Sequence, residues 1–217
     1  MQDAERAAIQ PNWPPKAFTV IGVDQSPQLI KIARERGVAS GRDTQYEVSN
    51  LLRFSPPAAC NAVLCRGVLN DFTDDHDRHL IFQKFAEWLA PGGVLIFDVR
   101  DWVASASRYR DQPIVNRHVA LQDGGELAFS SCTTPSHATR ELHVRESFEY
   151  RHGEDIMKTE NLFTMRCWSR AELNRMLANC YHEVSIVTSY GEPEGKWRDR
   201  LVVIATVSTS RHPANGP

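Results

Sequence analysis

The first clear pattern in the chain is a short apolar run followed by a helical segment. Residues 18–23 are apolar in the way that is typical of a buried parallel strand. Ser26 can cap the helix that follows, Pro27 suits its first turn, and Gly37 suits its left-handed end. Together they predict a strand, a tight turn and a helix, with Asp24 at the carboxyl end of the strand.

The same alternation continues as far as Trp102. Residues 46–52 predict a short strand, and residues 62–69 and 94–99 predict two buried strands. Pro91-Gly92-Gly93 is predicted to stop a helix before the last of these. That helix is indicated by apolar residues at helical spacing, namely Leu80, Ile81, Phe85, Trp88 and Leu89. The alternation predicts a Rossmann-like α/β fold, in which a mostly parallel sheet has helices on both faces.

The pattern changes after Trp102. Apolar and polar residues alternate along 142–150 and again along 163–167, which is the period of half-exposed strands. His152-Gly153-Glu154-Asp155 between them has the composition of a hairpin turn. With a further strand predicted at 127–133, these segments indicate an antiparallel meander inserted into the α/β domain.

A final helix and two strands follow the meander. Ser169 and Glu172 have the spacing of a capping box that opens a helix. Residues 184–189 and 200–207 predict an antiparallel strand pair at the sheet edge. We therefore expect one domain at 1–217, made of a cofactor-side α/β half at 17–102, an antiparallel insertion at 103–167 that forms a substrate lid, a terminal helix and strand pair at 168–207, and a tail at 208–217.

Composition excludes several classes of protein. The 217 residues are 41% hydrophobic with a formal net charge of −2, which argues against disorder and against a dedicated nucleic-acid binder. There is no run of about 20 apolar residues and no signal-peptide pattern, so we expect a cytoplasmic protein without a membrane partner. The five scattered cysteines and eight dispersed histidines indicate neither a disulfide framework nor a metal site.

Polar side chains stand where the predicted strands end, and ligands of open α/β sheets bind outside these carboxyl ends. A carboxylate at Asp24 can accept hydrogen bonds from both hydroxyls of a ribose. Asp-x-Ser before a helix is also common turn chemistry, and spacing alone leaves the two interpretations open. The other strand-end residues are Ser49 and Asn50 after the second strand, and Cys65, Arg66 and Gly67, followed by Asn70 and Asp71, after the third.

Several segments resemble class I S-adenosylmethionine-dependent methyltransferases. VIGVDQSPQLIKIAR, from Val20, is similar to the second strand and helix of that family. CNAVLCRGVLNDFTDDHDR, from Cys60, and FAEWLAPGGVLIFDVRDW, from Phe85, resemble its fourth strand, fourth helix and L-x-P-G-G strand. The terminal helix, VSIVTS and DRLVVIATV resemble its final strand pair. The resemblance implies a methyltransferase that acts on a small molecule and uses S-adenosylmethionine.

The resemblance also implies which residues bind this cofactor. Asp24 would hold the ribose hydroxyls, Gln25 would lie beside the adenosine, and Leu51 would pack on the adenine ring. Asn50 stands where the family usually has an Asp that meets the adenine amino group, and its amide oxygen can accept that bond without the charge. The methionine end would be lined by Cys65, Arg66 and Gly67. Cys65 is equally consistent with plain core packing.

One motif of the family is missing. Its glycine-rich G-x-G-x-G loop should stand roughly twenty residues before Asp24, yet Gly22 is the only glycine in that part of the sequence. The strand before this loop would lie in the middle of the sheet, beside the strand that ends at Asp24. Either the neighbouring strands close up, or another segment fills the gap, or the chain is truncated. We expect N-terminal truncation and, with it, impaired activity.

Methyl transfer from a sulfonium depends on orientation and the exclusion of water, and it needs no nucleophilic side chain. A base is required only where the acceptor must lose a proton. The candidate bases are Asp71, His76, Asp98 and Asp101, and Arg100 is available to hold an acidic substrate. The aspartates from Asp71 to Asp77 are also typical of a solvated helix start.

Two other functions stay open. A catalytically inactive methyltransferase fold could serve as a binding protein, or form a homodimer through a sheet edge or the meander, and the missing glycine loop favours this alternative. A nicotinamide-dependent dehydrogenase would use Asp24 for the same ribose hydroxyls. It needs a G-x-G-x-x-G loop that is equally absent, and it gives L-x-P-G-G no role.

Overall fold

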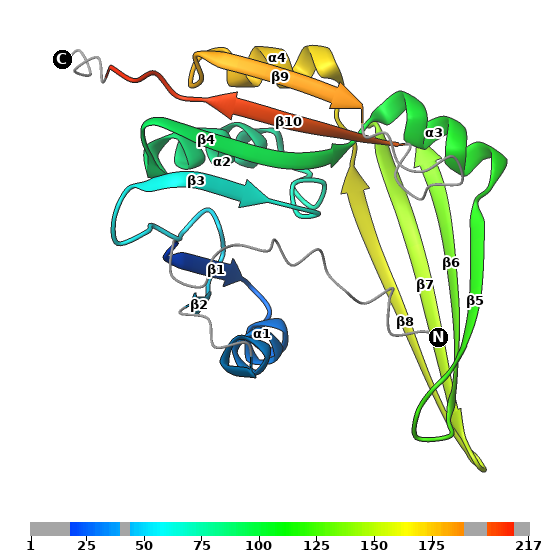
Figure 1. The fold of residues 1–217 in the computed structure, drawn as a ribbon. Coiled ribbons are helices and arrows are strands. Elements are labelled where there is room, and N and C mark those ends of the chain that lie inside the picture. The colour runs from blue at the N-terminus through cyan, green and yellow to red at the C-terminus, as the bar shows by residue number, and fades with distance from the viewer. Residues whose placement is uncertain (1–17, 40–43, 189–198, 211–217) are drawn as a thin grey trace. The chain divides into compact units, whose positions relative to one another are not determined.

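The computed structural model describes residues 18–39, 44–188 and 199–210. It divides the chain into two compact units, residues 1–56 and residues 57–217 (Figure 1). None of the described helices combines the length and the apolar character that crossing a membrane requires.

The first unit contains a parallel strand pair and one helix. β1 (Val20–Asp24) leads into α1 (Pro27–Ala39), and β2 (Thr44–Val48) pairs with β1 in parallel along its whole length. Ser26 Oγ accepts a hydrogen bond from the Leu29 N–H at 3.3 Å, which confirms its predicted place at the start of α1. The predicted order of strand, turn and helix is therefore present.

Gly37 does not end α1, as the sequence predicted, but lies inside it. A Cβ atom at Gly37 would stand 3.2 Å from Cε2 of the Tyr46 ring, and one at Gly22 on β1 would stand 2.8 Å from Cδ1 of the same ring. Both glycines therefore leave room for Tyr46. Close packing against a neighbouring strand, rather than a left-handed turn, explains the glycine at position 37.

The second unit is built on a four-stranded sheet. β3 (Cys60–Cys65) is parallel to β4 (Leu89–Arg100), whereas β10 (Arg200–Thr206) is antiparallel to both of its neighbours, β4 and β9 (Glu183–Thr188). The predicted antiparallel strand pair at the sheet edge is thus confirmed. In spatial order the strands are β3, β4, β10 and β9.

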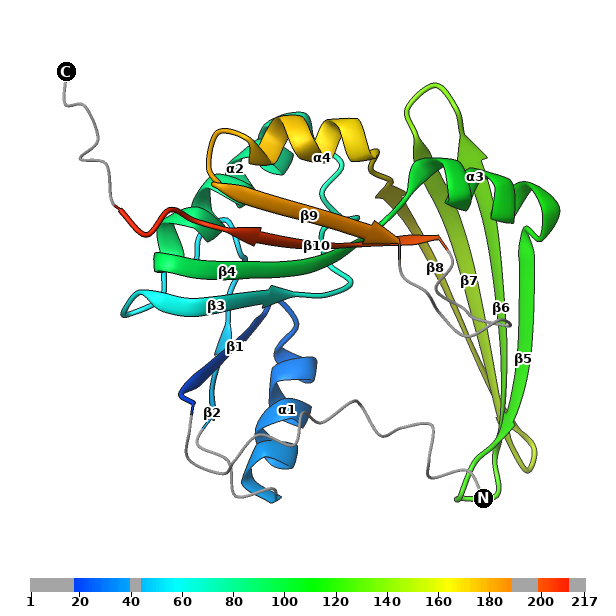
Figure 2. The same cartoon turned by 45° about the horizontal axis from the view of Figure 1, so that its top comes forward.

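Two helices, α2 (Asp75–Trp88) and α4 (Arg170–Leu177), cover one face of this sheet (Figures 1 and 2). Phe82 of α2 packs on Phe97 of β4 with ring centroids 5.2 Å apart, and both side chains are fully buried. The opposite face carries exposed apolar side chains. Its most exposed members are Leu64 at 72%, Val187 at 45% and Ile204 at 43%.

The end of α2 differs from the prediction. The helix ends at Trp88 and β4 begins at the next residue, so Pro91-Gly92-Gly93 lies within the strand instead of in a loop before it. Gly92 has a φ of +75°, and the pairing of β3 with β4 shifts between Cys60 and Ala62. The glycines therefore accommodate an irregular start of the strand.

Between β4 and α4 the chain forms a second, fully antiparallel sheet, whose strands in spatial order are β5 (Ile114–Ala120), β6 (Glu126–Ser136), β7 (Glu141–His152) and β8 (Asp155–Arg166). His152 pairs with Asp155 across the tip of the β7–β8 hairpin, which confirms the predicted turn and meander. The helix α3 (Trp102–Asp111) lies between β4 and β5 in the chain.

α3 and β5 were not predicted. The buried side of α3 consists of Ser105, Ala106 and Tyr109, and two small residues give little hydrophobic periodicity. β5 has mostly exposed side chains because it is the edge strand of its sheet. Neither element therefore carries the strong apolar pattern on which the sequence prediction relied.

β1 and β3 each have one edge without a strand partner in the part of the chain that is described. β1 pairs with β2 alone, and β3 pairs with β4 alone. The sequence left open that strands close up around the missing strand or that another segment fills its place. Neither β1 nor β3 has a second strand partner among the described residues.

Candidate functional site

In the first unit, Asp24 stands at the carboxyl end of β1 and is half-buried. Its Oδ1 accepts a hydrogen bond from the Ser26 N–H at 2.8 Å, and its backbone oxygen accepts one from the Ser49 N–H at 3.0 Å. Its Oδ2 accepts no hydrogen bond from the described residues. Both sequence interpretations of Asp24 are therefore compatible, because Oδ1 forms the turn while Oδ2 has no hydrogen-bond donor among the described residues.

Asn50 holds the corresponding turn after β2. Its Oδ1 accepts the Leu52 N–H at 2.8 Å, and its backbone oxygen accepts the N–H groups of Arg53 and Phe54. An amide oxygen has two lone pairs, so this bond leaves Asn50 one further acceptor position. Leu51 beside it is half-buried. Asp24, Gln25, Asn50 and Leu51 thus gather at the carboxyl ends of two paired strands.

In the second unit, Cys65 and Gly67 occupy the carboxyl end of β3. Cys65 is buried, and desolvation, with a smaller contribution from Asp98, raises the pKa of its thiol to about 12. The thiol is therefore protonated at neutral pH, which agrees with core packing. Gly67 has a φ of +75°, and no atom lies within 4 Å of an added Cβ. The space beside Gly67 is open, and Arg66 next to it is exposed.

Three of the candidate residues at the end of β4 have protein partners. Asp98 accepts hydrogen bonds from the Gly67 N–H at 2.8 Å and from Arg200 at 2.6 Å. Arg100 pairs with Asp199, which is only 1% exposed. Asp101 caps α3, since its Oδ2 accepts the Ala104 N–H at 3.0 Å. These side chains hold the strand ends together.

Asp71 lies in the loop after β3, and His76 lies at the start of α2. The Asp71 side chain accepts no hydrogen bond from the described residues, and desolvation raises its pKa above the ordinary value for an aspartate. The His76 side chain is exposed, while its backbone N–H donates to Asp74, the N-cap of α2. Of the candidate bases, Asp71 has the local environment that best suits a proton acceptor.

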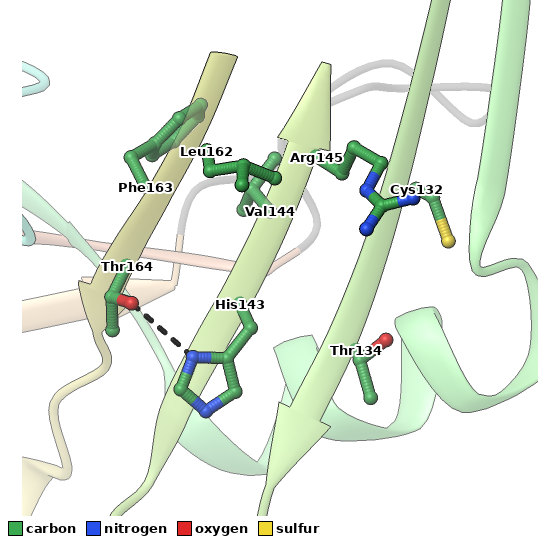
Figure 3. Close-up of a pocket in the computed structure, with 8 residues that line it drawn as sticks. All are labelled: Cys132, Thr134, His143, Val144, Arg145, Leu162, Phe163 and Thr164. Atoms are coloured by element: carbon green, nitrogen blue, oxygen red, sulfur yellow. Dashed lines mark hydrogen bonds between the residues drawn. The ribbon is translucent and has the colours of Figure 1, made fainter. Parts of the chain in front are cut away.

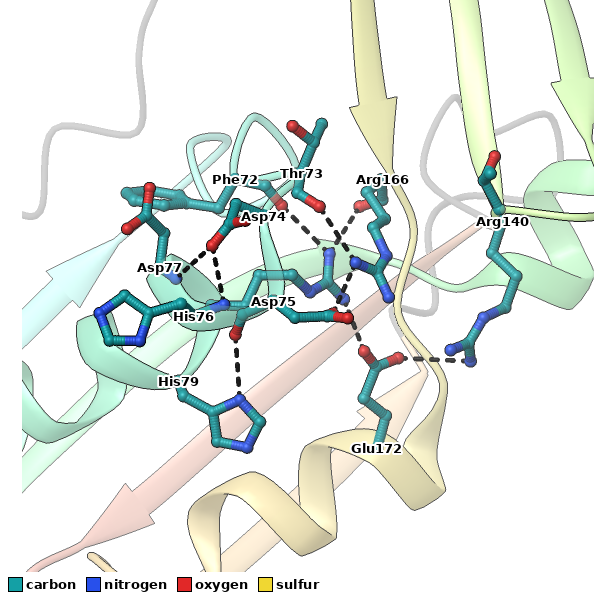
Figure 4. A network of polar contacts seen from close by, with 12 residues as sticks. Phe72, Thr73, Asp74, Asp75, His76, Asp77, His79, Arg140, Arg166 and Glu172 are labelled. Carbon is teal, nitrogen blue, oxygen red and sulfur yellow. Dashed lines mark hydrogen bonds and ion pairs between the residues drawn. The ribbon is translucent and has the colours of Figure 1, made fainter.

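Asn70 ties the loop after β3 to two other strands. It is 2% exposed; its Oδ1 accepts the Arg100 N–H at 3.1 Å and its Nδ2 donates to the Arg166 carbonyl at 3.0 Å. Arg166, the last residue of β8, in turn donates to the Thr73 carbonyl at 3.0 Å and pairs with Asp75 at 2.6 Å (Figure 4). The sequence placed Asn70 at a strand end but gave no sign of these partners.

A buried ion pair lies next to this loop and was missed by the sequence analysis. The Arg78 guanidinium lies 3.4 Å from the centre of the Trp168 ring and donates to Glu172 Oε1 at 3.0 Å. Burial lowers the pKa of Arg78 to about 10, and the charge of Glu172 opposes that shift. The second oxygen of Glu172 pairs with Arg140 at 3.4 Å (Figure 4).

This pair corrects half of the predicted capping box. Ser169 Oγ accepts the Glu172 N–H at 3.2 Å, so the serine caps α4 as expected. The Glu172 side chain does not return to Ser169, because both of its oxygens are directed to arginines. We call Arg78, Trp168 and Glu172, together with Arg140, the Arg78 junction.

A shallow pocket of about 480 Å³ lies on one face of the β5–β8 sheet (Figure 3). Thr134, His143 and Thr164 form one row of its lining across three strands, and the His143 Nδ1 lies 3.2 Å from Thr164 Oγ1. Cys132 and Arg145 belong to the next row. The pocket therefore offers hydroxyl, imidazole and guanidinium groups on an exposed surface.

Among the described residues, no group of three or more His, Cys, Asp or Glu side chains could hold a metal ion. All five cysteines carry free thiols.

Comparison with known proteins identifies the class of this fold. Residues 7–93 match the model of a family described as a methyltransferase domain. No curated protein sequence matches the chain.

Solved structures match over most of the chain. One is an S-adenosylmethionine-dependent methyltransferase from Clostridium acetobutylicum, with a TM-score of 0.71 and 15% identity, covering 88% of this chain and 76% of that one. Another is CalS10, an amino pentose methyltransferase from Micromonospora echinaspora, with a TM-score of 0.67, 20% identity, and coverage of 88% and 74%. The sugar N-methyltransferase KedS8 from a Streptoalloteichus species has a TM-score of 0.70, 17% identity, and coverage of 87% and 70%.

The fold is therefore similar to that of class I S-adenosylmethionine-dependent methyltransferases, and the predicted Rossmann-like α/β fold is confirmed. The family match spans the strand ends at Asp24, Asn50 and Gly67, which lie in both units.

Proposed function

We propose that the protein transfers a methyl group from S-adenosylmethionine to a small-molecule acceptor. The observation that carries this proposal is the methyltransferase-domain match over residues 7–93, which includes the strand ends with the candidate cofactor residues. Similar structures act on small molecules: two are described as an amino pentose methyltransferase and a sugar N-methyltransferase. A sugar or another small polar molecule is therefore the acceptor class that we favour.

Each unit, taken by itself, has a residue that suits one part of the cofactor. Asp24 has a carboxylate oxygen without a hydrogen bond from the described residues, which suits the ribose hydroxyls. Gly67 has open space on the side where any other residue would place a Cβ, which suits the methionine end. In this proposal Gln25, Asn50 and Leu51 hold the adenosine, and Cys65 and Arg66 flank Gly67. When bound, the cofactor supplies the electrophilic methyl group.

The acceptor would be held by the insertion and by the loop after β3. The β5–β8 sheet is attached to that loop through Asn70 and Arg166, so its pocket face and Asp71 belong to neighbouring parts of the second unit. Asp71 would take a proton from the acceptor where one has to be lost. A raised pKa makes this carboxylate a better proton acceptor at neutral pH than an ordinary aspartate.

Isothermal titration of S-adenosylmethionine into the full chain tests the cofactor part of the proposal. Asp24→Asn keeps an oxygen for the Ser26 N–H but removes the charge, so the fold should be unchanged. Hydrogen bonds to a charged group contribute about 1.5–3 kcal/mol, so we expect about 10- to 100-fold weaker binding.

Asp111→Asn is the matched control, because Asp111 is an exposed aspartate at the end of α3 whose side chain contacts Arg110. Its binding constant should equal that of the wild type. Equal affinity of wild type and Asp24→Asn would contradict the assignment of Asp24, and no binding by the wild type would contradict the proposed function.

A second candidate function is a binding protein without activity that forms a homodimer. It is favoured by the open apolar face of the four-stranded sheet, on which Leu64 is 72% exposed, and by the uncharged edge strand β3. Sedimentation of the wild type and of Leu64→Lys distinguishes the two functions. A dimer that the substitution dissociates, in a chain that binds no S-adenosylmethionine, would favour the second.

A further inference from the structure

The face of the β5–β8 sheet that carries the first pocket carries a second one. This second pocket has a volume of about 520 Å³, and its lining includes Ser130, Ser147, Lys158 and Glu160. Ser130, Ser147 and Glu160 form one row across β6, β7 and β8, two residues along from the row of Cys132, Arg145 and Leu162 in the first pocket. Side chains two residues apart in a strand share a face.

The two pockets adjoin. Arg145 lines the first and Glu160 lines the second, and their side chains form an ion pair at 3.1 Å across the boundary. Along β8 the lining extends from Thr164 to Lys158. Six steps at about 3.3 Å per residue give the two pockets together a span of roughly 20 Å, which is longer than a single sugar ring, and we call the two pockets the trough.

One end of the trough lies beside the loop after β3. Arg166 is two residues beyond Thr164 and points to the same face of the sheet. Its side chain contacts the Thr73 carbonyl and Asp75 (Figure 4). A ligand in the first pocket would therefore extend toward the loop that carries Asp71, and its far part would occupy the second pocket.

The charges in the trough are matched. Arg145 pairs with Glu160, and Lys158 pairs with Glu149 at 2.7 Å, so neither pocket offers an unopposed cation or anion from these residues. The remaining polar groups are mainly neutral donors and acceptors, among them Thr134, Ser130, Ser147 and Asn116. Such groups complement hydroxyls better than phosphates or carboxylates.

We propose that this trough binds an elongated, uncharged, hydroxyl-rich molecule, namely a glycoside of two or more sugar units, with its far unit in the second pocket. That this molecule is the methyl acceptor rests on the proposed function. The binding of the glycoside to the trough does not rest on the proposed function, because the lining residues all belong to the insertion.

The test is a titration of the isotope-labelled full chain, followed by NMR, with glucose, cellobiose, cellotriose and inorganic pyrophosphate as probes. We expect cellotriose to bind about tenfold more tightly than glucose, which corresponds to about 1.4 kcal/mol, and to shift signals of both pockets. Ser147→Trp should fill the second pocket and remove this gain. Asn161→Trp places the same ring on the opposite face of the adjacent strand and should retain it.

Equal affinity for glucose and cellotriose, unchanged cellotriose binding by Ser147→Trp, or preferential binding of pyrophosphate would each overturn the inference. So would a dimer in sedimentation that only Ser147→Trp dissociates, since the face would then be covered by a second copy. Titration of S-adenosylmethionine into the same samples separates the two proposals. Cofactor binding without saccharide binding refutes the trough alone, and saccharide binding without cofactor binding refutes the proposed function alone.

Discussion

Two arginine–glutamate pairs, one at the base of the insertion and one in the middle of its sheet, have nearly the same length and very different surroundings. Arg78 and Glu172 are 3.0 Å apart, with side chains 0% and 4% exposed. Arg145 and Glu160 are 3.1 Å apart, with side chains 67% and 53% exposed. The first pair belongs to the Arg78 junction, where the insertion meets α2 and α4, and the second lies in the trough.

The difference teaches that burial, and not geometry, determines what each pair does. A buried charge that loses its partner cannot be solvated, so the Arg78 junction fixes the base of the insertion. Water solvates Arg145 and Glu160 whether or not they form the ion pair, so the pair contributes little stability. Either side chain can therefore leave its partner and contact a ligand instead. The buried pair therefore stabilises the base of the insertion, while the exposed pair constrains the surface of its sheet only weakly.

The largest effect is expected from Glu172→Ala. It leaves Arg78 buried without its carboxylate, and breaking a buried pair in this way costs about 3–5 kcal/mol. Urea unfolding followed by circular dichroism measures the loss.

The double variant Arg78→Leu with Glu172→Leu sharpens this result. Replacing both charges by apolar side chains is often nearly neutral, so we expect it to regain more than half of the stability. A loss below about 1 kcal/mol for Glu172→Ala alone would show that the Arg78 junction behaves like a surface pair.

The same glutamate shows how far the sequence could be used. The spacing of Ser169 and Glu172 predicts the start of α4, because a helix cap is a local interaction. It cannot predict the partner of the Glu172 side chain, because Arg78 lies 94 positions earlier and reaches it only through the tertiary fold. The individual strands and the hairpin turn were predictable for the same reason as the cap, since apolar runs and turns are local patterns.

The candidate site likewise contains residues that local patterns locate and residues whose partners are distant in the sequence. Strand ends locate Asp24 and Gly67 from sequence, since both follow apolar runs. The partners of Asp98 and Arg100 are Arg200 and Asp199, 102 and 99 positions away, so the sequence could not distinguish these structural side chains from the less constrained Asp71.

A smaller effect is expected from Ser169→Ala. Its hydroxyl accepts one backbone N–H at the start of α4, and the loss of such a cap costs about 1 kcal/mol. Ser107→Ala, at an exposed serine within α3, is the control and should change stability by less than about 0.5 kcal/mol. If Ser169→Ala cost as much as Glu172→Ala in the same urea titration, the two residues would act as one capping box after all.

The smallest effect is expected from Glu160→Gln, at most about 0.5 kcal/mol, because the pair with Arg145 is exposed. Measuring the free energy of unfolding at low and at high salt tests this small effect more sharply than its size suggests. At about 1 M sodium chloride the interaction between exposed charges is screened within about 3 Å, so the small difference from wild type should vanish. The loss in Glu172→Ala should persist at the same salt concentration, because solvent ions do not reach a pair that is 0% and 4% exposed. A salt-independent loss in Glu160→Gln would mean that the trough holds the pair as rigidly as the Arg78 junction holds its own.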